Sequence, residues 1–320
     1  MSVSVLGSGA FGTALALSLA GQMPVTLWAR DAGHAQQMQT ERCNRRRLGD
    51  FAFPETLTVT DDLHSTAQAD TLLLALPLQQ LRGFLTGAGD ALSTQTLVAC
   101  CKGMELRSGA APHEIIDQTL PHATPAILTG PGFARDIAAG LPTAMTLACA
   151  DPGQASRLQA LLSGATLRLY RSTDMTGAAL GGALKNVVAI ACGAAMGAGL
   201  GESARAALMT RGNAEMARLA ERRGADPATL SGLSGFGDLV LTCTSEQSRN
   251  YRYGLAIGAS RSFDQNTTVE GAATALAMHS VAQENDLDLP ITSAVAGLVE
   301  NRLDVAEAMS RLLSRTLKEE

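Results

Sequence analysis

The first half of the chain alternates short apolar runs with segments of helical periodicity. The run Thr71–Leu76 is continuously apolar and stops at Pro77, a pattern typical of a strand buried on both faces of a parallel sheet. A helix is predicted over Gly12–Ala20, between two such runs. This alternation predicts an α/β fold with a mostly parallel, doubly wound sheet. The other predicted strands are Val3–Leu6, Val25–Ala29, Leu97–Cys101, Ala126–Leu128, Thr143–Ala148 and Thr166–Leu169.

The pattern changes near Arg171–Thr173, beyond which strand signals almost vanish. Gly224 is a suitable stop for one of the helices that follow, because glycine tolerates the left-handed conformation at a helix end. We therefore expect two domains, a dinucleotide-binding domain over 1–175 and an all-α C-terminal domain over 176–320 that binds the substrate. The predicted helices of the second domain are Met175–Gly197, Ser203–Arg223, Thr274–Glu284, Ala294–Asn301 and Asp304–Leu317.

Composition narrows the classes of function. The 320 residues are 46% hydrophobic but only 3% aromatic, and 32 of them are glycine, so elements can pack closely around small side chains. The formal net charge of −5 argues against a nucleic-acid partner, because such binding depends on neutralising phosphates. One dense basic patch, formed by Arg42, Arg45, Arg46 and Arg47, is interpreted as a solvated loop face.

The spacing of the cysteines and the sequence at the N-terminus indicate the cellular compartment. Six cysteines are scattered without a C-x-x-C pair, so we expect no metal site and no disulfide framework, as in a reducing cytoplasm. The N-terminus leads directly into a strand, and no signal peptide is expected. The uncharged run Val187–Gly201 is shorter than the ~20 residues that span a bilayer, so we predict no integral membrane segment.

A glycine-rich loop follows the first predicted strand. Gly7, Gly9 and Gly12 form a G-x-G-x-x-G motif between a strand and a helix, with Ala10 and Phe11 inside it. In this context the motif predicts a Rossmann-type site, in which backbone N–H groups of a helix start hold the pyrophosphate. Arg30 arrives as the second strand ends and can pair with a 2′-phosphate, whereas the neighbouring Asp31 suits NAD. We favour NADP as the cofactor, with NAD possible.

Charged residues next to apolar or strand segments provide candidate chemistry. Lys185 lies in Gly181–Asn186, directly before the uncharged run, and a charge there needs a partner or a purpose. Taken alone, Lys185 also fits a lysine that caps a helix end. Lys102 follows a predicted strand, at the edge of the sheet where ligands bind, although a surface lysine would look the same. Gly130 follows another strand, in a segment that also fits a simple turn.

Taken together, these segments make the chain resemble the bacterial NAD(P)-dependent glycerol-3-phosphate dehydrogenases nearly from end to end. The order and spacing of the matching segments make the resemblance specific. They are the Gly7–Gly12 loop, Trp28–Arg30, Lys102-Gly103, Gly130-Pro131, Gly181–Asn186, Ala204–Leu208, Thr210–Gly212, Gly235–Thr244, Ser248–Asn250 and Val269–Gly271.

The resemblance implies hydride transfer between NAD(P)H and dihydroxyacetone phosphate, which gives sn-glycerol 3-phosphate for phospholipid synthesis. It implies that Lys185 is the proton donor or acceptor, with Lys102 and Asp238 beside it in the catalytic set. The implied substrate-binding residues are Lys102, Gly130, Gly132, Lys185, Asn186, Asp238, Ser248, Arg249 and Asn250. The implied cofactor-binding residues are Gly7, Gly9, Ala10, Phe11, Gly12, Arg30, Lys102, Ala134, Arg249 and Glu270.

Ketone reduction is consistent with these residue types. A hydride must reach carbon and a proton must reach the developing alkoxide, and a positioned ammonium both stabilises that charge and donates the proton. No metal is required. The chain departs from the family pattern at several positions without losing a charged catalytic group, so substrate affinity is affected more than reaction class. The departures are Ala10-Phe11 for Ser-Trp, Gly132 for Ser, Ala179 for Glu, Ser203 for Asn and Thr268 for an apolar residue.

Two other functions compete with this interpretation. Another two-domain NADP-dependent dehydrogenase, of the β-hydroxyacid or ketopantoate reductase type, shares the glycine loop and a helical lysine but lacks the Ser248–Asn250 segment. A non-catalytic NADPH-binding sensor would have no reason to keep Lys102, Lys185 and Asp238 together. The resemblance also implies a homodimer.

Overall fold

The computed structural model describes residues 2–92, 95–265 and 267–314, which form two compact units. The first unit takes the chain up to Lys102 together with Pro112–Ala178, and the second takes Gly103–Ala111 together with the chain from Ala179 onward. The short segment Gly103–Ala111 thus leaves the first unit for the second, which no local sequence pattern indicates. The division of cofactor and substrate between the two remains a prediction.

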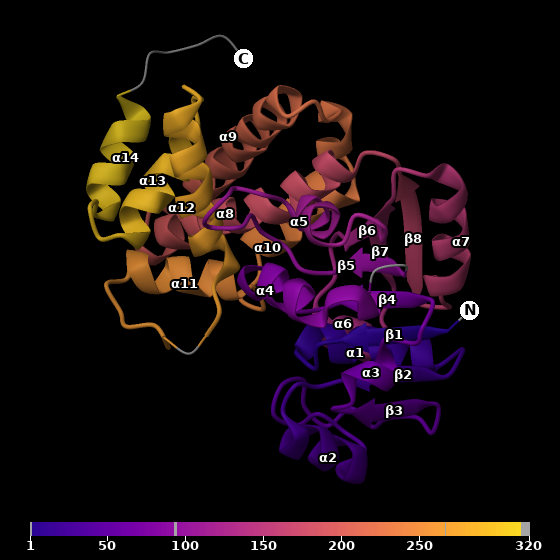
Figure 1. Ribbon diagram of the computed structural model, residues 1–320. Helices are drawn as coiled ribbons and strands as arrows, with labels where there is room; N and C mark the ends of the chain where they lie inside the picture. The colour runs from indigo at the N-terminus through magenta and orange to yellow at the C-terminus, as the bar shows by residue number, and fades with distance from the viewer. Residues whose placement is uncertain (1, 93–94, 266, 315–320) are drawn as a thin grey trace. The chain divides into compact units, whose positions relative to one another are not determined.

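The first unit is built on an eight-stranded sheet in the described residues, with strand order β3-β2-β1-β4-β5-β6-β7-β8 (Figure 1). Neighbouring strands are parallel except for β6 and β7, so the predicted mostly parallel, doubly wound sheet is confirmed. The central strands β1, β4 and β5 are buried at every residue, as their unbroken apolar runs predicted. The strands are Val3–Leu6 (β1), Val25–Trp28 (β2), Leu57–Thr60 (β3), Thr71–Leu74 (β4), Thr96–Ala99 (β5), Thr124–Thr129 (β6), Thr143–Ala148 (β7) and Leu167–Ser172 (β8).

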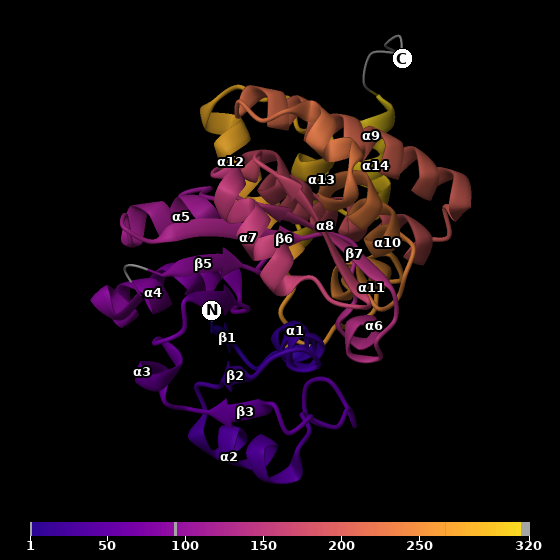
Figure 2. The same cartoon turned by 90° about the vertical axis from the view of Figure 1, so that its right-hand side faces the viewer.

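Helices cover both faces of this sheet, α3, α4 and α5 on one side and α1 and α6 on the other (Figure 2). Several of them begin at an acidic residue whose side chain accepts a hydrogen bond from the first turn, as Asp151 does at α7. The helices are Ala10–Ala20 (α1), Ala32–Glu41 (α2), Leu63–Thr66 (α3), Leu78–Ala88 (α4), Pro112–Thr119 (α5), Ala134–Ala138 (α6) and Pro152–Leu162 (α7), with a 3₁₀ turn at Gly89–Leu92 (η1).

The regular secondary structure of the second unit is all helical among its described residues, as predicted. Gly224 has φ of +71° and ends α9 as expected. The last helix was predicted to reach Leu317, but residues 315–317 lie outside the described part of the chain. The elements are Met175–Gly197 (α8, whose first residues belong to the first unit), Gly201–Arg222 (α9), Pro227–Ser231 (η2), Leu233–Gly237 (η3, a π-helix), Asp238–Cys243 (α10), Arg249–Gly258 (α11), Glu270–Glu284 (α12), Pro290–Val299 (α13) and Val305–Leu313 (α14).

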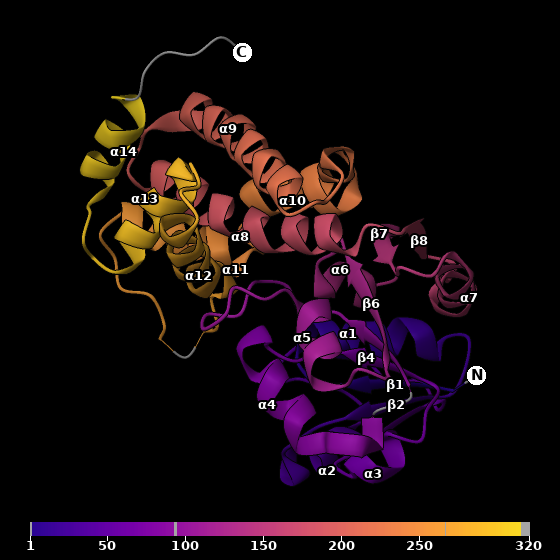
Figure 3. The same cartoon turned by 45° about the horizontal axis from the view of Figure 1, so that its top comes forward.

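Helix α8 runs through the middle of this unit, with α9 on one side and α11 and α12 on the other (Figure 3). By length and composition alone it is apolar enough to cross a membrane, but 89% of its most apolar stretch is buried inside the protein. Close packing depends on glycine. A Cβ at Gly193 would stand 2.1 Å from the carbonyl oxygen of Tyr251, and one at Gly254 would stand 2.1 Å from that of Ile190. These two glycines therefore let α8 and α11 approach to backbone contact.

Polar contacts fix the remaining elements of the second unit. The buried carboxylate of Glu215 on α9 accepts hydrogen bonds from the backbone N–H groups of Ile291 and Thr292, at 2.8 and 3.0 Å, in the first turn of α13. Burial raises the pKa of Glu215, and these donors oppose that effect. Arg223 donates to the carbonyl of Gly109 at 2.8 Å, which ties the segment Gly103–Ala111 to this unit.

Candidate active site and dinucleotide loop

The glycine-rich loop connects β1 to α1, and each glycine has its own reason to lack a side chain. Gly7 has φ of +116°, and a Cβ there would stand 2.6 Å from the carbonyl oxygen of Ala75. A Cβ at Gly12 would stand 2.1 Å from the carbonyl oxygen of Gly7. Gly9 is exposed and nothing lies within 4 Å of its Cβ position. Gly7 and Gly12 are thus needed for the turn itself, whereas Gly9 leaves open space outside it.

The start of α1 suits an anion. Gly9 precedes the helix without a side-chain hydrogen bond, and the first turn carries no acidic residue. The N–H groups of a first helical turn have no intrahelical partner, and the helix dipole places partial positive charge there. Ala10 and Phe11 are half-buried in this turn. Open space at Gly9 beside free helical donors fits the pyrophosphate of a dinucleotide.

The end of β2 carries the two residues that discriminate between cofactors. Arg30 lies two residues after the end of the strand and is exposed. Asp31 caps α2, because its carboxylate accepts the backbone N–H of His34 at 2.7 Å. The carboxylate that would favour ribose hydroxyls therefore has a structural partner, while the guanidinium beside it is exposed.

Lys102 follows β5, and its Nζ donates to the carbonyl of Gly130 at 3.1 Å, directly after the neighbouring strand β6. Gly130 has φ of +138° and packs against the backbone of Met145. Lys102 is half-buried. The structure thus brings two of the predicted substrate residues together at the carboxyl ends of adjacent parallel strands, where ligands bind in sheets of this type.

Gly132 and Ala134 lie farther along the same segment, with Ala134 at the first position of α6. A Cβ at Gly132 would stand 3.1 Å from Thr143 Cγ2 and 3.2 Å from Ile137 Cδ1. The crowding shows that glycine fits this loop without rearrangement and that a serine side chain would press on its neighbours.

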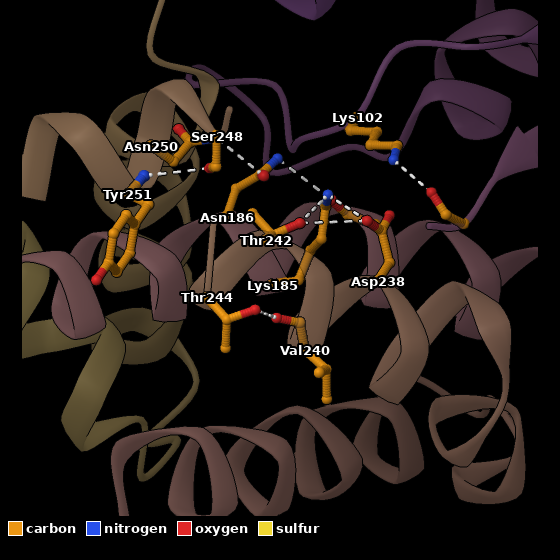
Figure 4. Close-up of polar contacts among 12 residues, drawn as sticks. Lys102, Lys185, Asn186, Asp238, Val240, Thr242, Thr244, Ser248, Asn250 and Tyr251 are labelled. Atoms are coloured by element: carbon orange, nitrogen blue, oxygen red, sulfur yellow. Dashed lines mark hydrogen bonds and ion pairs between the residues drawn. The ribbon is translucent and has the colours of Figure 1, made fainter. Parts of the chain in front are cut away.

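Lys185 lies on α8 and is 5% exposed, so its charge is almost fully removed from water. Its Nζ donates to Asp238 Oδ1 and to Thr242 Oγ1, each at 2.7 Å, and the Thr242 hydroxyl donates to Asp238 Oδ1 at 3.2 Å (Figure 4). These three side chains form a closed hydrogen-bonded triangle. A buried ammonium is tolerated because a buried carboxylate pairs with it.

Local structure explains why these residues meet. Asp238 and Thr242 are four residues apart on α10, so both side chains lie on one helical face. The π-helix η3 leads into α10, and irregular helical turns of this kind are frequent at functional sites. A Cβ at Gly181 would stand 2.4 Å from the carbonyl oxygen of Ser234 in η3. Glycine at 181 therefore lets α8 approach η3 and brings Lys185 to the face of α10.

A chain of amides continues from the lysine. Asn186 Oδ1 accepts from Asn250 Nδ2 at 2.9 Å (Figure 4). Asn250 Oδ1 in turn accepts from the backbone N–H of Gly271 at 3.0 Å. A Cβ at Gly271 would stand 2.6 Å from the carbonyl oxygen of Asn186. Glu270, half-buried, begins α12 beside this contact. The predicted residues Asn186, Asn250 and Glu270 are thus close together, and the amide orientations are fixed.

Ser248 and Arg249 lie at the start of α11 in different roles. The Ser248 hydroxyl accepts the backbone N–H of Tyr251 at 3.2 Å and caps the helix. Arg249 is exposed, and in the part of the chain that the structure describes it forms no salt bridge with Glu246. The guanidinium is therefore not held by the nearby carboxylate.

Sequence reasoning missed Thr242, although its spacing of one helical turn from Asp238 was the available signal. Two thiols near these segments are not candidate nucleophiles. Burial raises the pKa of Cys243, which follows Thr242, and burial likewise raises that of Cys100 before Lys102. Both thiols stay protonated at neutral pH.

Comparison with known proteins identifies the family of this chain. The family model described as the NAD-dependent glycerol-3-phosphate dehydrogenase N-terminus matches residues 2–155, and the model for the C-terminus of the same family matches residues 174–310. A glycerol-3-phosphate dehydrogenase [NAD(P)+] of Roseobacter denitrificans is 64% identical over all 320 residues, which cover 100% of both chains. A protein of the same name from Ruegeria sp. is 59% identical, again over 100% of both chains.

A solved structure is similar over the same span. The crystal structure of glycerol-3-phosphate dehydrogenase from Coxiella burnetii has a TM-score of 0.93 and 36% sequence identity, and the match covers 98% of this chain and 99% of that one. Both the sequence relatives and this structure extend over both units. The chain therefore belongs to the family of NAD(P)-dependent glycerol-3-phosphate dehydrogenases.

Proposed function

We propose that this protein reduces dihydroxyacetone phosphate to sn-glycerol 3-phosphate with NAD(P)H, and so supplies glycerophospholipid synthesis. The observation that carries the proposal is the buried ammonium of Lys185, held at 2.7 Å by both Asp238 and Thr242. The family relationship across the whole chain supports the reaction class.

Lys185 is the proposed general acid. When it is bound, the reduced nicotinamide supplies the hydride, and the carbonyl oxygen of the substrate then develops negative charge that an ammonium stabilises. Asp238 keeps Lys185 charged, because an adjacent carboxylate favours the protonated amine. Thr242 fixes the direction of the ammonium. In the reverse direction the neutral amine would accept the proton.

The substrate phosphate needs hydrogen-bond donors that are held in position or exposed to the incoming ligand. We assign it to Arg249 and Asn250, with backbone donors near Gly130 and Gly132, because a planar guanidinium matches phosphate oxygens in pairs. We assign Lys102 to the junction of substrate and cofactor, and we assign to the Asn186 amide the orientation of the substrate. Ser248 contributes by setting the start of α11.

The cofactor is assigned to Gly7, Gly9, Gly12 and the half-buried Ala10 and Phe11 at the start of α1. Lys102, Ala134, Arg249 and Glu270 complete the proposed cofactor set. Arg30 favours NADPH over NADH, because its guanidinium is exposed while Asp31 caps a helix. NADH is expected to bind more weakly.

We also propose that the protein works in a reducing cytoplasm and that it forms a homodimer. All six cysteines are free and buried, which is compatible with a compartment that keeps thiols reduced. Size-exclusion chromatography with light scattering measures the oligomeric state.

The reaction is tested by the absorbance of reduced nicotinamide in the presence of the purified full chain. We expect rapid oxidation of NADPH, and slower oxidation of NADH, with dihydroxyacetone phosphate as substrate. Unphosphorylated dihydroxyacetone and ketopantoate serve as matched substrates and should react poorly. Faster turnover of ketopantoate than of dihydroxyacetone phosphate would contradict the proposed substrate.

A further inference from the structure

Lys102 lies between two anchored points of the backbone. The N–H of Cys100, two residues before it, donates to the carbonyl of Leu74 at 3.0 Å and continues the ladder between β4 and β5. The N–H of Met104, two residues after it, donates to Thr274 Oγ1 on α12 at 3.3 Å. The sheet thus holds the chain before Lys102, whereas a side-chain hydroxyl of the second unit holds the chain after it.

Thr274 is 0% exposed, and its hydroxyl takes part in two hydrogen bonds. It donates to the carbonyl of Glu270 at 2.9 Å, a bond that a threonine inside a helix often makes to the residue four positions earlier. That bond alone would make Thr274 an ordinary helical threonine. The bond from Met104 is different, because it joins residues 170 positions apart and uses the acceptor capacity that the hydroxyl still has.

Gly103 makes the second anchor important. It connects Lys102 to Met104 with φ of +132°, a conformation that residues with a side chain rarely adopt. Glycine has the widest choice of backbone conformations, so Gly103 by itself leaves the direction of the chain at Lys102 open. The bond from Met104 to Thr274 selects one of these directions, and in that direction Lys102 Nζ donates to the carbonyl of Gly130 at 3.1 Å.

The segment Gly103–Ala111 is fastened to the second unit at its other end as well. Arg223 donates to the carbonyl of Gly109 at 2.8 Å, and a Cβ at Gly109 would stand 2.7 Å from Val281 Cγ2 on α12. The segment is therefore mounted on the second unit at both ends, and the contact with Thr274 is made two residues from Lys102.

The first turns of α12 also hold other predicted site residues. The N–H of Gly271 donates to Asn250 Oδ1 at 3.0 Å, and Glu270 begins the helix. Thr274 lies one turn farther along and is bonded to Glu270 through its hydroxyl. The same part of one helix thus fixes Asn250, Glu270 and the backbone that follows Lys102.

We infer that Thr274 is a positioning residue for the reaction, because its hydroxyl fixes the backbone after Lys102 and thereby the direction of the Lys102 ammonium. The inference rests on the proposed function, which assigns Lys102 to the junction of substrate and cofactor. In this role Thr274 acts through the N–H of Met104 and needs no contact with substrate or cofactor.

Two substitutions in the full chain separate the hydroxyl from the rest of the side chain. Thr274→Val removes the hydroxyl and keeps a similar shape, whereas Thr274→Ser keeps the hydroxyl. With NADPH and dihydroxyacetone phosphate, kcat/KM should fall about 10- to 100-fold in Thr274→Val, since a misplacement of about 1 Å has an effect of this order. Thr274→Ser should stay close to the parent.

Thr66→Val is the matched control. Thr66 is 1% exposed, and its hydroxyl donates to the carbonyl of Asp62 at 2.7 Å, four residues earlier in the chain. It therefore resembles Thr274 in burial and in its bond to the preceding turn. Thr66→Val should leave kcat/KM unchanged.

Two further measurements test the contact and the route by which it acts. Amide hydrogen exchange at Met104 should become faster in Thr274→Val and return to the parent rate in Thr274→Ser. Single-turnover assays with enzyme in excess measure the residual rate of Lys102→Ala. Adding Thr274→Val to that variant should cause no further loss, because both changes then affect the same group.

Normal kcat/KM or unchanged exchange at Met104 in Thr274→Val would overturn the inference. An equally low kcat/KM in Thr274→Ser would assign the effect to packing of the methyl group. An equal loss from Thr274→Val with and without Lys102 would assign it to another residue of the site. A parent protein that does not oxidise NADPH with dihydroxyacetone phosphate would instead contradict the proposed function, while exchange at Met104 would still report on the contact.

Discussion

The two units hold their functional cations in opposite ways. In the first unit, the predicted cofactor residue Arg30 is exposed and lacks a carboxylate partner among the described residues. In the second, Lys185 is buried and pairs with Asp238 and Thr242. Under the proposed function, the cation that captures an anion stays accessible, whereas the cation that donates a proton is held in place by its neighbours.

Arginine and lysine differ chemically in a way that suits these two roles. An arginine keeps its charge under all conditions and offers a planar set of donors, which suits phosphate groups. A lysine can release a proton, and its direction has to be set by neighbours if it is to act as a general acid. The triangle of Lys185, Asp238 and Thr242 sets that direction, so the variants below should separate binding from chemistry.

Removal of Asp238 should have the largest effect on stability. Asp238→Ala leaves the buried ammonium of Lys185 without its carboxylate, and breaking a buried pair from one side typically costs about 3–5 kcal/mol. Chemical denaturation of the full chain measures this loss. The double variant Lys185→Met/Asp238→Leu should recover most of the lost stability and remain inactive, because no charge is then left unpaired. An Asp238→Ala protein as stable as the parent would show that the pair is not desolvated.

The glycine loop offers a matched pair of substitutions. Gly12→Ala forces a Cβ to 2.1 Å from the carbonyl of Gly7, so the backbone must shift, with an expected loss of about 1–3 kcal/mol in unfolding free energy. Gly9→Ala meets nothing within 4 Å and should keep normal stability. It should nevertheless bind NADPH and NADH about tenfold more weakly, because the methyl occupies the approach of the pyrophosphate. Normal cofactor affinity in Gly9→Ala would place the pyrophosphate elsewhere.

Arg249 allows the exposed arginine and the buried lysine to be compared within one unit. It is exposed, whereas Lys185 of the same unit is buried. Arg249→Lys should raise the KM for dihydroxyacetone phosphate by about tenfold or more, because lysine lacks the planar fork. Steady-state kinetics with dihydroxyacetone phosphate and with unphosphorylated dihydroxyacetone provide the comparison, and the second substrate should be poor in both proteins. An unchanged KM would move phosphate recognition to Lys102.

Much of the fold was predictable because its signals are local. The buried strands β1, β4 and β5 are continuous apolar runs, and α8 is a long helix rich in small residues, with Lys185 as its one charged residue. Strand β3 was missed, since Leu57–Thr60 is short and partly exposed. The helices α10 and α11 were missed as elements, and α10 is only six residues long.

The site was harder to predict where it depends on tertiary contacts. The spacing of Asp238 and Thr242 was readable, but the approach of Lys185 depends on glycine 181 meeting η3. Thr274 gives no sequence signal, because its partner Met104 lies 170 residues away in the chain. Arg45 forms ion pairs with Glu41 and Asp50 in the fold, whereas Arg46 lacks a carboxylate partner among the described residues. The density of arginines in the sequence does not reveal this difference.

Substitution of Lys185 tests the central claim most directly. The account predicts that Lys185→Ala binds NADPH with the affinity of the parent, measured by calorimetry, because the lysine is no part of the cofactor loop. With saturating dihydroxyacetone phosphate, its kcat should fall by about 10²- to 10⁴-fold, the usual contribution of general acid catalysis. Near-normal turnover of a variant that binds NADPH normally would contradict the role of the buried lysine and the mechanism built on it.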